Sequence, residues 1–99
     1  MAEYILLMNW TEQGIRKIKD SPKRLDAARK LAKACGAKFG DFYMTIGKYD
    51  MLAHLTAPDD ATVAKFVLRA ASGGNVRITT LKAFTESEYR KIIGALCEK

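Results

Sequence analysis

Two apolar runs joined by a tight turn constrain the fold of this chain more than any other feature. The first run, residues 37–46, is rich in aromatic side chains, and the second, residues 51–56, follows the turn Gly47-Lys48-Tyr49-Asp50. Gly47 can adopt a positive φ and Asp50 can hydrogen-bond back to the backbone, as turns between paired strands require. We therefore predict a β-hairpin in the middle of the chain.

Each half of the chain is predicted to contain one helix between two strands, with one of those strands belonging to the hairpin. Residues 3–10 and 75–83 have strand patterns, and helical patterns follow Thr11 and Pro58. The order is β-α-β-β-α-β, and the right-handed crossover rule turns it into a split βαβ layout. We predict an α+β ferredoxin-like sandwich with a four-stranded antiparallel sheet, helices on one face and an extra C-terminal helix.

Local signals predict where the helices begin and end. Thr11 can cap a short helical turn, and Ser21-Pro22 is a second start signal, so the first connection should be broken near Asp20. Gly36 is placed to end the helix that begins at Ser21, because glycine readily adopts the left-handed backbone conformation common at helix ends. Thr85 and Glu88 form a capping box for the last helix. We expect that helix to bury an apolar stripe formed by Tyr89, Ile92, Ile93 and Leu96.

The first strand is apolar on both faces: Tyr4, Leu6 and Met8 alternate with Ile5 and Leu7. In a sheet covered by helices on one side, the other face should be polar. Something must cover the second face, which is the main argument for self-association. We take the face of Tyr4, Leu6 and Met8 as the contact surface, and expect Leu6→Glu to dissociate a dimer.

The size and composition indicate one globular domain over residues 1–99. Apolar residues make up 48% and charged residues 28% of the 99 residues. The longest apolar run is residues 5–8, so we expect no membrane span. The start lacks a basic and apolar leader, so we expect a cytoplasmic protein. Cys35 and Cys97 should be small buried hydrophobes, and we predict no metal site and no cofactor.

The net charge of +6 is concentrated in one segment. Residues 16–38 contain nine Lys and Arg side chains against Asp20 and Asp26. A basic helix can attract nucleic acid or an acidic partner. A solvated helix face is the commoner explanation, and we do not expect nucleic acid as the main partner.

His54 is the only histidine, and strand parity places it with Leu52 and Thr56. It is the one side chain that ordinarily titrates near neutrality, which makes it the candidate general acid or base. A neutral imidazole held inside a subunit interface is the commoner outcome. A cavity on the same sheet face, with Tyr43 nearby, would favour the catalytic interpretation.

Further candidates for ligand binding lie at the strand ends, and each also has a structural explanation. Trp10 could stack on a ligand or seal one end of the core. Tyr49 and Asp50 could project over a pocket or serve the turn alone. Arg77 could bind a carboxylate or phosphate or form a surface ion pair. Tyr43 completes the set of candidate ligand-binding residues.

Several blocks, in order along residues 3–96, resemble the GYD domain family of small bacterial and archaeal proteins. They are Tyr4-Ile5-Leu6-Leu7, Asn9-Trp10-Thr11, Gly14-Ile15, Lys19-Asp20-Ser21-Pro22-Lys23-Arg24, Gly47-Lys48-Tyr49-Asp50, Ala57-Pro58-Asp59-Asp60, Gly74-Asn75-Val76-Arg77 and Ala83-Phe84-Thr85. The resemblance implies a ferredoxin-like domain that pairs through its sheet, like the dimeric α+β barrel proteins. It implies no particular activity.

Our leading hypothesis is a cytoplasmic homo-oligomer, at least a dimer, that binds a small organic molecule in a pocket lined by sheet residues. If it is an enzyme, His54 would act as general acid or base without a cofactor, oriented by Tyr49 and Asp50. The alternative is a non-catalytic regulatory or protein-interaction module. Weak nucleic-acid binding through residues 16–38 is a third hypothesis.

Overall fold

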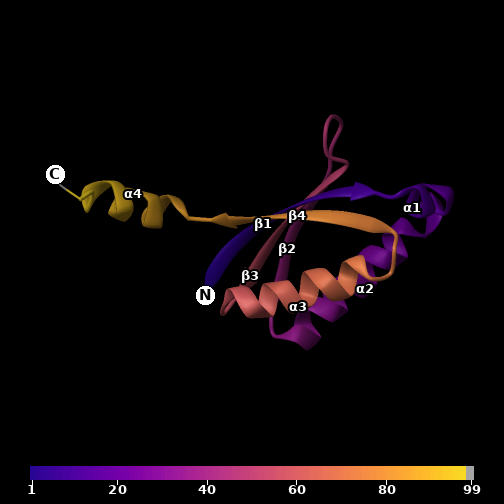
Figure 1. Cartoon of the computed structure of the whole chain (residues 1–99), viewed down its shortest axis with the longest axis horizontal. Coiled ribbons are helices and arrows are strands. Elements are labelled where there is room, and N and C mark those ends of the chain that lie inside the picture. Colours follow the sequence, from indigo (N-terminus) through magenta and orange to yellow (C-terminus); the bar gives the residue numbers. More distant parts are fainter. Residues whose placement is uncertain (98–99) are drawn as a thin grey trace.

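The computed structural model describes residues 1–97, which form a four-stranded sheet with two long helices beneath it (Figure 1). The elements in chain order are β1 (Ala2–Trp10), α1 (Glu12–Arg16), the short 3₁₀ helix η1 (Ile18–Asp20), α2 (Ser21–Cys35), β2 (Lys38–Met44), β3 (Met51–Ala57), α3 (Asp60–Ala71), β4 (Val76–Ala83) and α4 (Glu86–Gly94). This is the predicted order with the predicted C-terminal helix added.

The strands lie in the order β2-β3-β1-β4, and every neighbouring pair is antiparallel. The two crossovers place α2 and α3 on the same side of the sheet (Figure 1). The expected ferredoxin-like fold is therefore confirmed, with β1 in the centre and β2 and β4 at the edges.

One face of the sheet, here called the inner face, packs against the helices. It contains Tyr4, Leu6 and Met8 of β1, all at most 7% exposed, and Met51, Ala53 and Leu55 of β3. The expectation that Tyr4, Leu6 and Met8 form the contact surface was therefore wrong. Helices α2 and α3 cover them, and an acidic residue at position 6 would disrupt the core of a single chain.

The other face, here called the open face, is covered by no helix of residues 1–97 (Figure 1). The strand register places the following residues on it: Glu3, Ile5, Leu7, Asn9, Lys38, Tyr43, Leu52, His54, Thr56, Arg77, Thr79, Leu81 and Ala83. Its centre is apolar even though it faces outward. Both faces of β1 are therefore apolar as predicted, with the roles of the two faces exchanged, and self-association stays a prediction.

The first connection is broken at the predicted place. The Thr11 hydroxyl accepts a hydrogen bond from the Gly14 amide, which caps α1, and η1 separates α1 from α2 at Asp20. Gly36 ends α2 at a φ of 89°, in the left-handed region. The Ser21 side chain serves a different purpose from the predicted cap, because its hydroxyl accepts a hydrogen bond from the Trp10 indole.

Helix α4 projects away from the rest of the chain (Figure 1). Thr85 and Glu88 form the predicted capping box. The expected buried stripe was wrong for the single chain, because Tyr89, Ile92, Ile93 and Leu96 are all exposed. The prediction that both cysteines are buried was also wrong for Cys97, which is exposed just past α4, whereas Cys35 is half-buried. The apolar side of this short helix is therefore exposed in the single chain.

Candidate functional site

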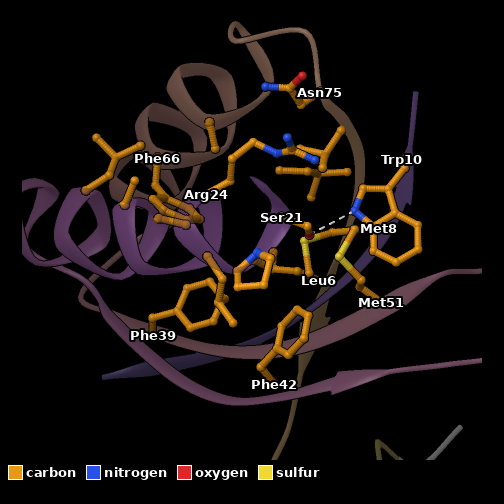
Figure 2. A pocket seen from close by; sticks show the side chains of 18 of the residues that line it. Leu6, Met8, Trp10, Ser21, Arg24, Phe39, Phe42, Met51, Phe66 and Asn75 are labelled. Atoms are coloured by element: carbon orange, nitrogen blue, oxygen red, sulfur yellow. Dashed lines mark hydrogen bonds between the residues drawn. The ribbon is translucent and has the colours of Figure 1, made fainter. Parts of the chain in front are cut away.

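A cavity with a volume of about 670 Å³ lies between the inner face and helices α2 and α3 (Figure 2). Its walls are almost entirely apolar. They include Leu6 and Met8 of β1, Phe42 of β2, Leu31 of α2 and Phe66 of α3. Cavities of roughly 300–1,000 Å³ with apolar walls are typical of sites for small organic molecules.

Polar groups meet at one end of this cavity. The Trp10 indole donates to the Ser21 hydroxyl at 3.3 Å, and both residues line the wall (Figure 2). Arg24 of α2 donates from Nη1 to the Lys17 carbonyl and from Nη2 to the Gly14 carbonyl, each at 3.1 Å. Five N–H donors belong to a guanidinium, so three remain for another acceptor.

The cavity has positive but no negative lining groups among the described residues. Arg24 and Arg69 line it, and no aspartate or glutamate does. Neither arginine takes part in any of the ion pairs found within residues 1–97. A cationic end on an otherwise apolar cavity sets an electrostatic preference for anions.

The open face carries a different arrangement. Ile5, Leu7, Leu52 and Leu81 lie on adjacent strands at its centre. Beside them, Nε2 of His54 lies 2.6 Å from Oε1 of Glu3, on the neighbouring strand. The imidazole is therefore positioned by a carboxylate, which orients the ring and fixes which nitrogen faces it.

The residues of the hairpin turn hold the hairpin to β1. The carboxylate of Asp50 accepts from the Trp10 amide at 3.0 Å and from the Asn9 side chain at 3.5 Å. The Asp50 amide donates to the Met8 carbonyl. Tyr49 borders a small hollow of about 220 Å³ on the open side, together with Leu7, Thr45, Ile46, Lys48 and Leu52.

The predicted site residues do not meet in one place. Trp10 lines the large cavity beneath the sheet, whereas the register places Tyr43, His54 and Arg77 on the open face. Tyr49 lies at the small hollow, and Asp50 bonds to β1. The roles of these residues in binding or catalysis stay predictions.

The sequence analysis did not predict the cavity beneath the sheet or the Arg24 guanidinium at its end. Arg24 was counted only as part of the basic segment, although it stands four residues before Ala28 and seven before Leu31. That spacing puts it on the apolar side of α2, where a charged residue is unusual. An arginine inside an apolar stripe was the signal that could have found the site.

Two acidic residues at the start of α3, Asp59 and Asp60, accept hydrogen bonds that shift a pKa. Hydrogen bonds from the backbone amide and hydroxyl of Thr62 hold the pKa of Asp59 below its ordinary value of 3.8. The Tyr4 hydroxyl donates to Oδ1 of Asp60, and this bond, with burial, raises the pKa of Tyr4 to about 12. Tyr4 is thus held as a neutral donor and ties β1 to α3.

Within residues 1–97, no group of three or more His, Cys, Asp or Glu side chains is placed to hold a metal ion. In the same range, no helix has the length and apolarity needed to cross a membrane.

Comparison with solved structures shows the fold. The chain matches the crystal structure of MtbAldR with a TM-score of 0.66 and 19% sequence identity, over 86% of this chain. It spans only 52% of that protein.

Comparison with known sequences shows the family. A protein of Thermus thermophilus, the glutamine synthetase and cystathionine beta-lyase binding protein, is 32% identical over 84 residues. That match covers 84% of this chain and 88% of the relative. The GYD domain model matches residues 4–93. The chain belongs to the GYD domain family.

Proposed function

We propose that the protein is a non-catalytic regulatory module, which pairs with a second copy through the open face and binds an enzyme. The observation that carries this proposal is the open face itself. It is a sheet surface with an apolar centre that none of the described helices covers. Contiguous exposed apolar surface of this kind marks sites of protein association.

A second copy suits the open face better than a helix would. Ile5, Leu7, Leu52 and Leu81 form a flat apolar centre across three strands, and Arg77, Lys38 and Glu3 lie toward its margins. Two such faces would stack about 10 Å apart, as sheets do in sandwiches. An apolar centre with a polar rim is also the usual anatomy of a protein interface.

Pairing through this face favours a structural role for His54. The imidazole and Glu3 would be covered by the partner copy, already bonded to each other at 2.6 Å. A substrate would then have no access to the ring. The interpretation of His54 as a satisfied interface residue fits this arrangement better than its interpretation as a general acid or base.

The binding of an enzyme is supported by the relative from Thermus thermophilus. Its name states that it binds glutamine synthetase and cystathionine beta-lyase. Apolar side chains also remain exposed on the hairpin, outside the open face of the present chain, where Ile46 is 100% exposed. This surface would serve for contact with a larger partner. The site of action would be the cytoplasm, where free thiols such as Cys35 and Cys97 persist.

Adjacent residues on opposite faces provide the test of pairing. Leu7→Glu places a charge on the open face and should give a folded monomer, because only the contact with the second copy is lost. Leu6→Glu places the same charge in the core, where Leu6 is 0% exposed, and should unfold the chain. Light scattering after gel filtration and circular dichroism would separate these results. A Leu7→Glu protein that stays dimeric would overturn the proposed interface.

Enzyme binding is tested separately with purified glutamine synthetase and cystathionine beta-lyase from the same organism as this chain. Each enzyme would be immobilised and titrated with the protein by biolayer interferometry. We expect saturable binding to at least one of them, and weaker binding by the Leu7→Glu variant because two copies give avidity. Absence of binding to both enzymes would remove the support taken from the relative.

A second candidate function is the binding of a small organic molecule, and the cavity beneath the sheet favours it. Its volume of about 670 Å³ and its apolar walls suit such a ligand. This location differs from the predicted one, on the open sheet face near Tyr43 and His54. Regulation by a ligand and binding to an enzyme are compatible roles of one module.

A further inference from the structure

We infer that the cavity beneath the sheet binds an amphipathic carboxylic acid, with the apolar part between α2 and the inner face and the carboxylate at Arg24. This inference rests on the second candidate function and names its ligand class. The cavity lies on the opposite side of the sheet from the open face, so dimer formation does not cover it.

The walls define the apolar part of the ligand. Leu6, Phe42, Phe66 and Leu31 contribute side chains from β1, β2, α3 and α2 to a cavity of about 670 Å³. The cavity is partly open to solvent, because Ile18 and Met44 of its lining are 40% and 68% exposed, so a ligand can enter it. Its apolar walls offer water few partners, whereas a hydrocarbon chain or an aromatic ring would fill it favourably.

The polar end defines the charge of the ligand. Arg24 extends across the cavity toward the end marked by Asn75 and Trp10 (Figure 2). Its two bonds to backbone carbonyls fix the position of the guanidinium and leave three donors. A planar fork of donors matches the two oxygens of a carboxylate, and such charge-assisted bonds are the strong ones.

The absence of competing acids strengthens the assignment. Among the residues that line the cavity within the described chain, Arg24 and Arg69 are cationic and none is anionic. A half-buried guanidinium ordinarily finds a carboxylate partner, and here the protein does not provide one. The ligand would supply the missing negative charge.

Trp10 provides the readout, because it lines the cavity and is the only tryptophan in the chain. Decanoate and decan-1-ol have the same hydrocarbon chain length and differ in charge, so they are the matched probes. We expect decanoate to change the Trp10 fluorescence saturably and to bind at least about tenfold more tightly than the alcohol, as a charge-assisted hydrogen bond predicts. Equal binding of the two would overturn the carboxylate assignment while leaving the cavity as a binding site. Binding of neither would overturn both.

Arg24→Gln should remove most of the preference for the acid and leave the affinity for the alcohol unchanged. Arg29→Gln is the matched control. Arg29 also lies on α2 and also donates to backbone carbonyls, those of Phe39 and Gly40, but it does not line the cavity. A preference for the acid that survives Arg24→Gln in a folded protein would contradict the role of Arg24.

A second pair of variants tests whether the ligand binds in this cavity, even if Arg24→Gln fails to fold. Ala28→Leu adds bulk inside the cavity, while Ala34→Leu makes the same change on an exposed position of the same helix. We expect Ala28→Leu to weaken both probes at least about tenfold and to raise the melting temperature by filling space. Ala34→Leu should alter neither. Unchanged binding by Ala28→Leu would place the ligand elsewhere and overturn the inference.

Discussion

Nε2 of His54 lies 2.6 Å from Oε1 of Glu3, joining β3 to β1 across the open face of the sheet. In a single chain both side chains are partly exposed, and an exposed pair of this kind contributes little to folding. In the proposed dimer the same pair would be desolvated. Its energetic importance should therefore appear in association and not in the stability of the monomer.

The first prediction concerns this pair. His54→Ala should leave the carboxylate of Glu3 without a partner inside the interface, weakening the dimer about tenfold or more. Adding Glu3→Gln to that variant should recover part of the loss, because the unpaired charge is gone. Sedimentation equilibrium measures both dissociation constants. Equal dimer affinity in the wild type and the His54→Ala variant would show that the pair lies outside the interface.

The second prediction concerns Gly14, which lies against the start of β4. A Cβ at this position would stand 2.1 Å from the carbonyl oxygen of Asn75. That oxygen also accepts a hydrogen bond from the Thr11 amide, so it cannot move freely. Gly14→Ala should cost about 2 kcal/mol or more and lower the melting temperature by roughly 10 °C.

Gly94 at the end of α4 is the control for that substitution. A Cβ there would meet no atom within 4 Å. Gly94→Ala should leave the melting temperature unchanged or raise it slightly, because alanine favours helix. A Gly14→Ala protein as stable as the Gly94→Ala protein would show that α1 is not packed as tightly as described.

The third prediction concerns acid stability. Asp59 caps α3, and its bonds from Thr62 hold its pKa in the folded state below the ordinary 3.8. The stabilisation is therefore present above pH 3.8 and is lost as the pH falls through the lowered folded value. Asp59→Asn keeps a capping oxygen but cannot titrate.

Melting temperatures measured from neutral pH down to pH 2 would check this prediction. The advantage of the wild type over Asp59→Asn should shrink steadily in acid, below about pH 4. A difference that stays constant over the whole range would mean that the Asp59 carboxylate does not stabilise the helix through its charge.

The fourth prediction concerns α4. A nine-residue helix is marginal in water without a packing partner, and its stripe of Tyr89, Ile92, Ile93 and Leu96 is exposed. Since β4 leads from the open face directly into α4, the helix should pack against the second copy. Ending the chain after Ala83 should weaken the dimer at least about tenfold.

The same truncation provides its own control in the monomeric Leu7→Glu background. There it should leave the melting temperature nearly unchanged, because α4 projects away from the body (Figure 1). A truncated wild-type chain with full dimer affinity would contradict a role for α4 between copies.

Local signals predicted most of the fold. Thr11, Gly36 and Thr85 act where sequence expects them to, and Gly47 adopts a φ of 136° in the turn. Each of these depends on interactions within a few residues, which a single sequence displays directly. The element order then leaves few topologies for a chain of this length.

The assignment of the two sheet faces failed because β1 alone is ambiguous. Ile5 and Leu6 are both apolar, so alternation does not say which face meets the helices. The paired strand holds the answer, since Ile5 stands opposite the polar His54 and Leu6 opposite the small apolar Ala53. The register between strands depends on the tertiary structure. Only when the register is known can the alternation of polar and apolar residues in β3 show which residues of β1 face the helices.

The cavity could not be predicted for a related reason. Its volume depends on the distance between α2 and the sheet, which no local pattern encodes. The hydrogen bond from the Trp10 amide to the Asp50 carboxylate could not be predicted either, because the two residues are 40 positions apart in the chain. Only the charge of Arg24 within an apolar stripe was visible beforehand.

The exposed position of Cys97 makes the molecule convenient for spectroscopy. It lies just past α4, while the only other thiol, Cys35, is half-buried at the end of α2. A maleimide dye would therefore attach preferentially beyond the projecting helix. Trp10 lines the cavity and is an intrinsic fluorophore. One labelled sample would therefore report ligand binding through Trp10 and the proposed packing of α4 through the dye, at separate wavelengths.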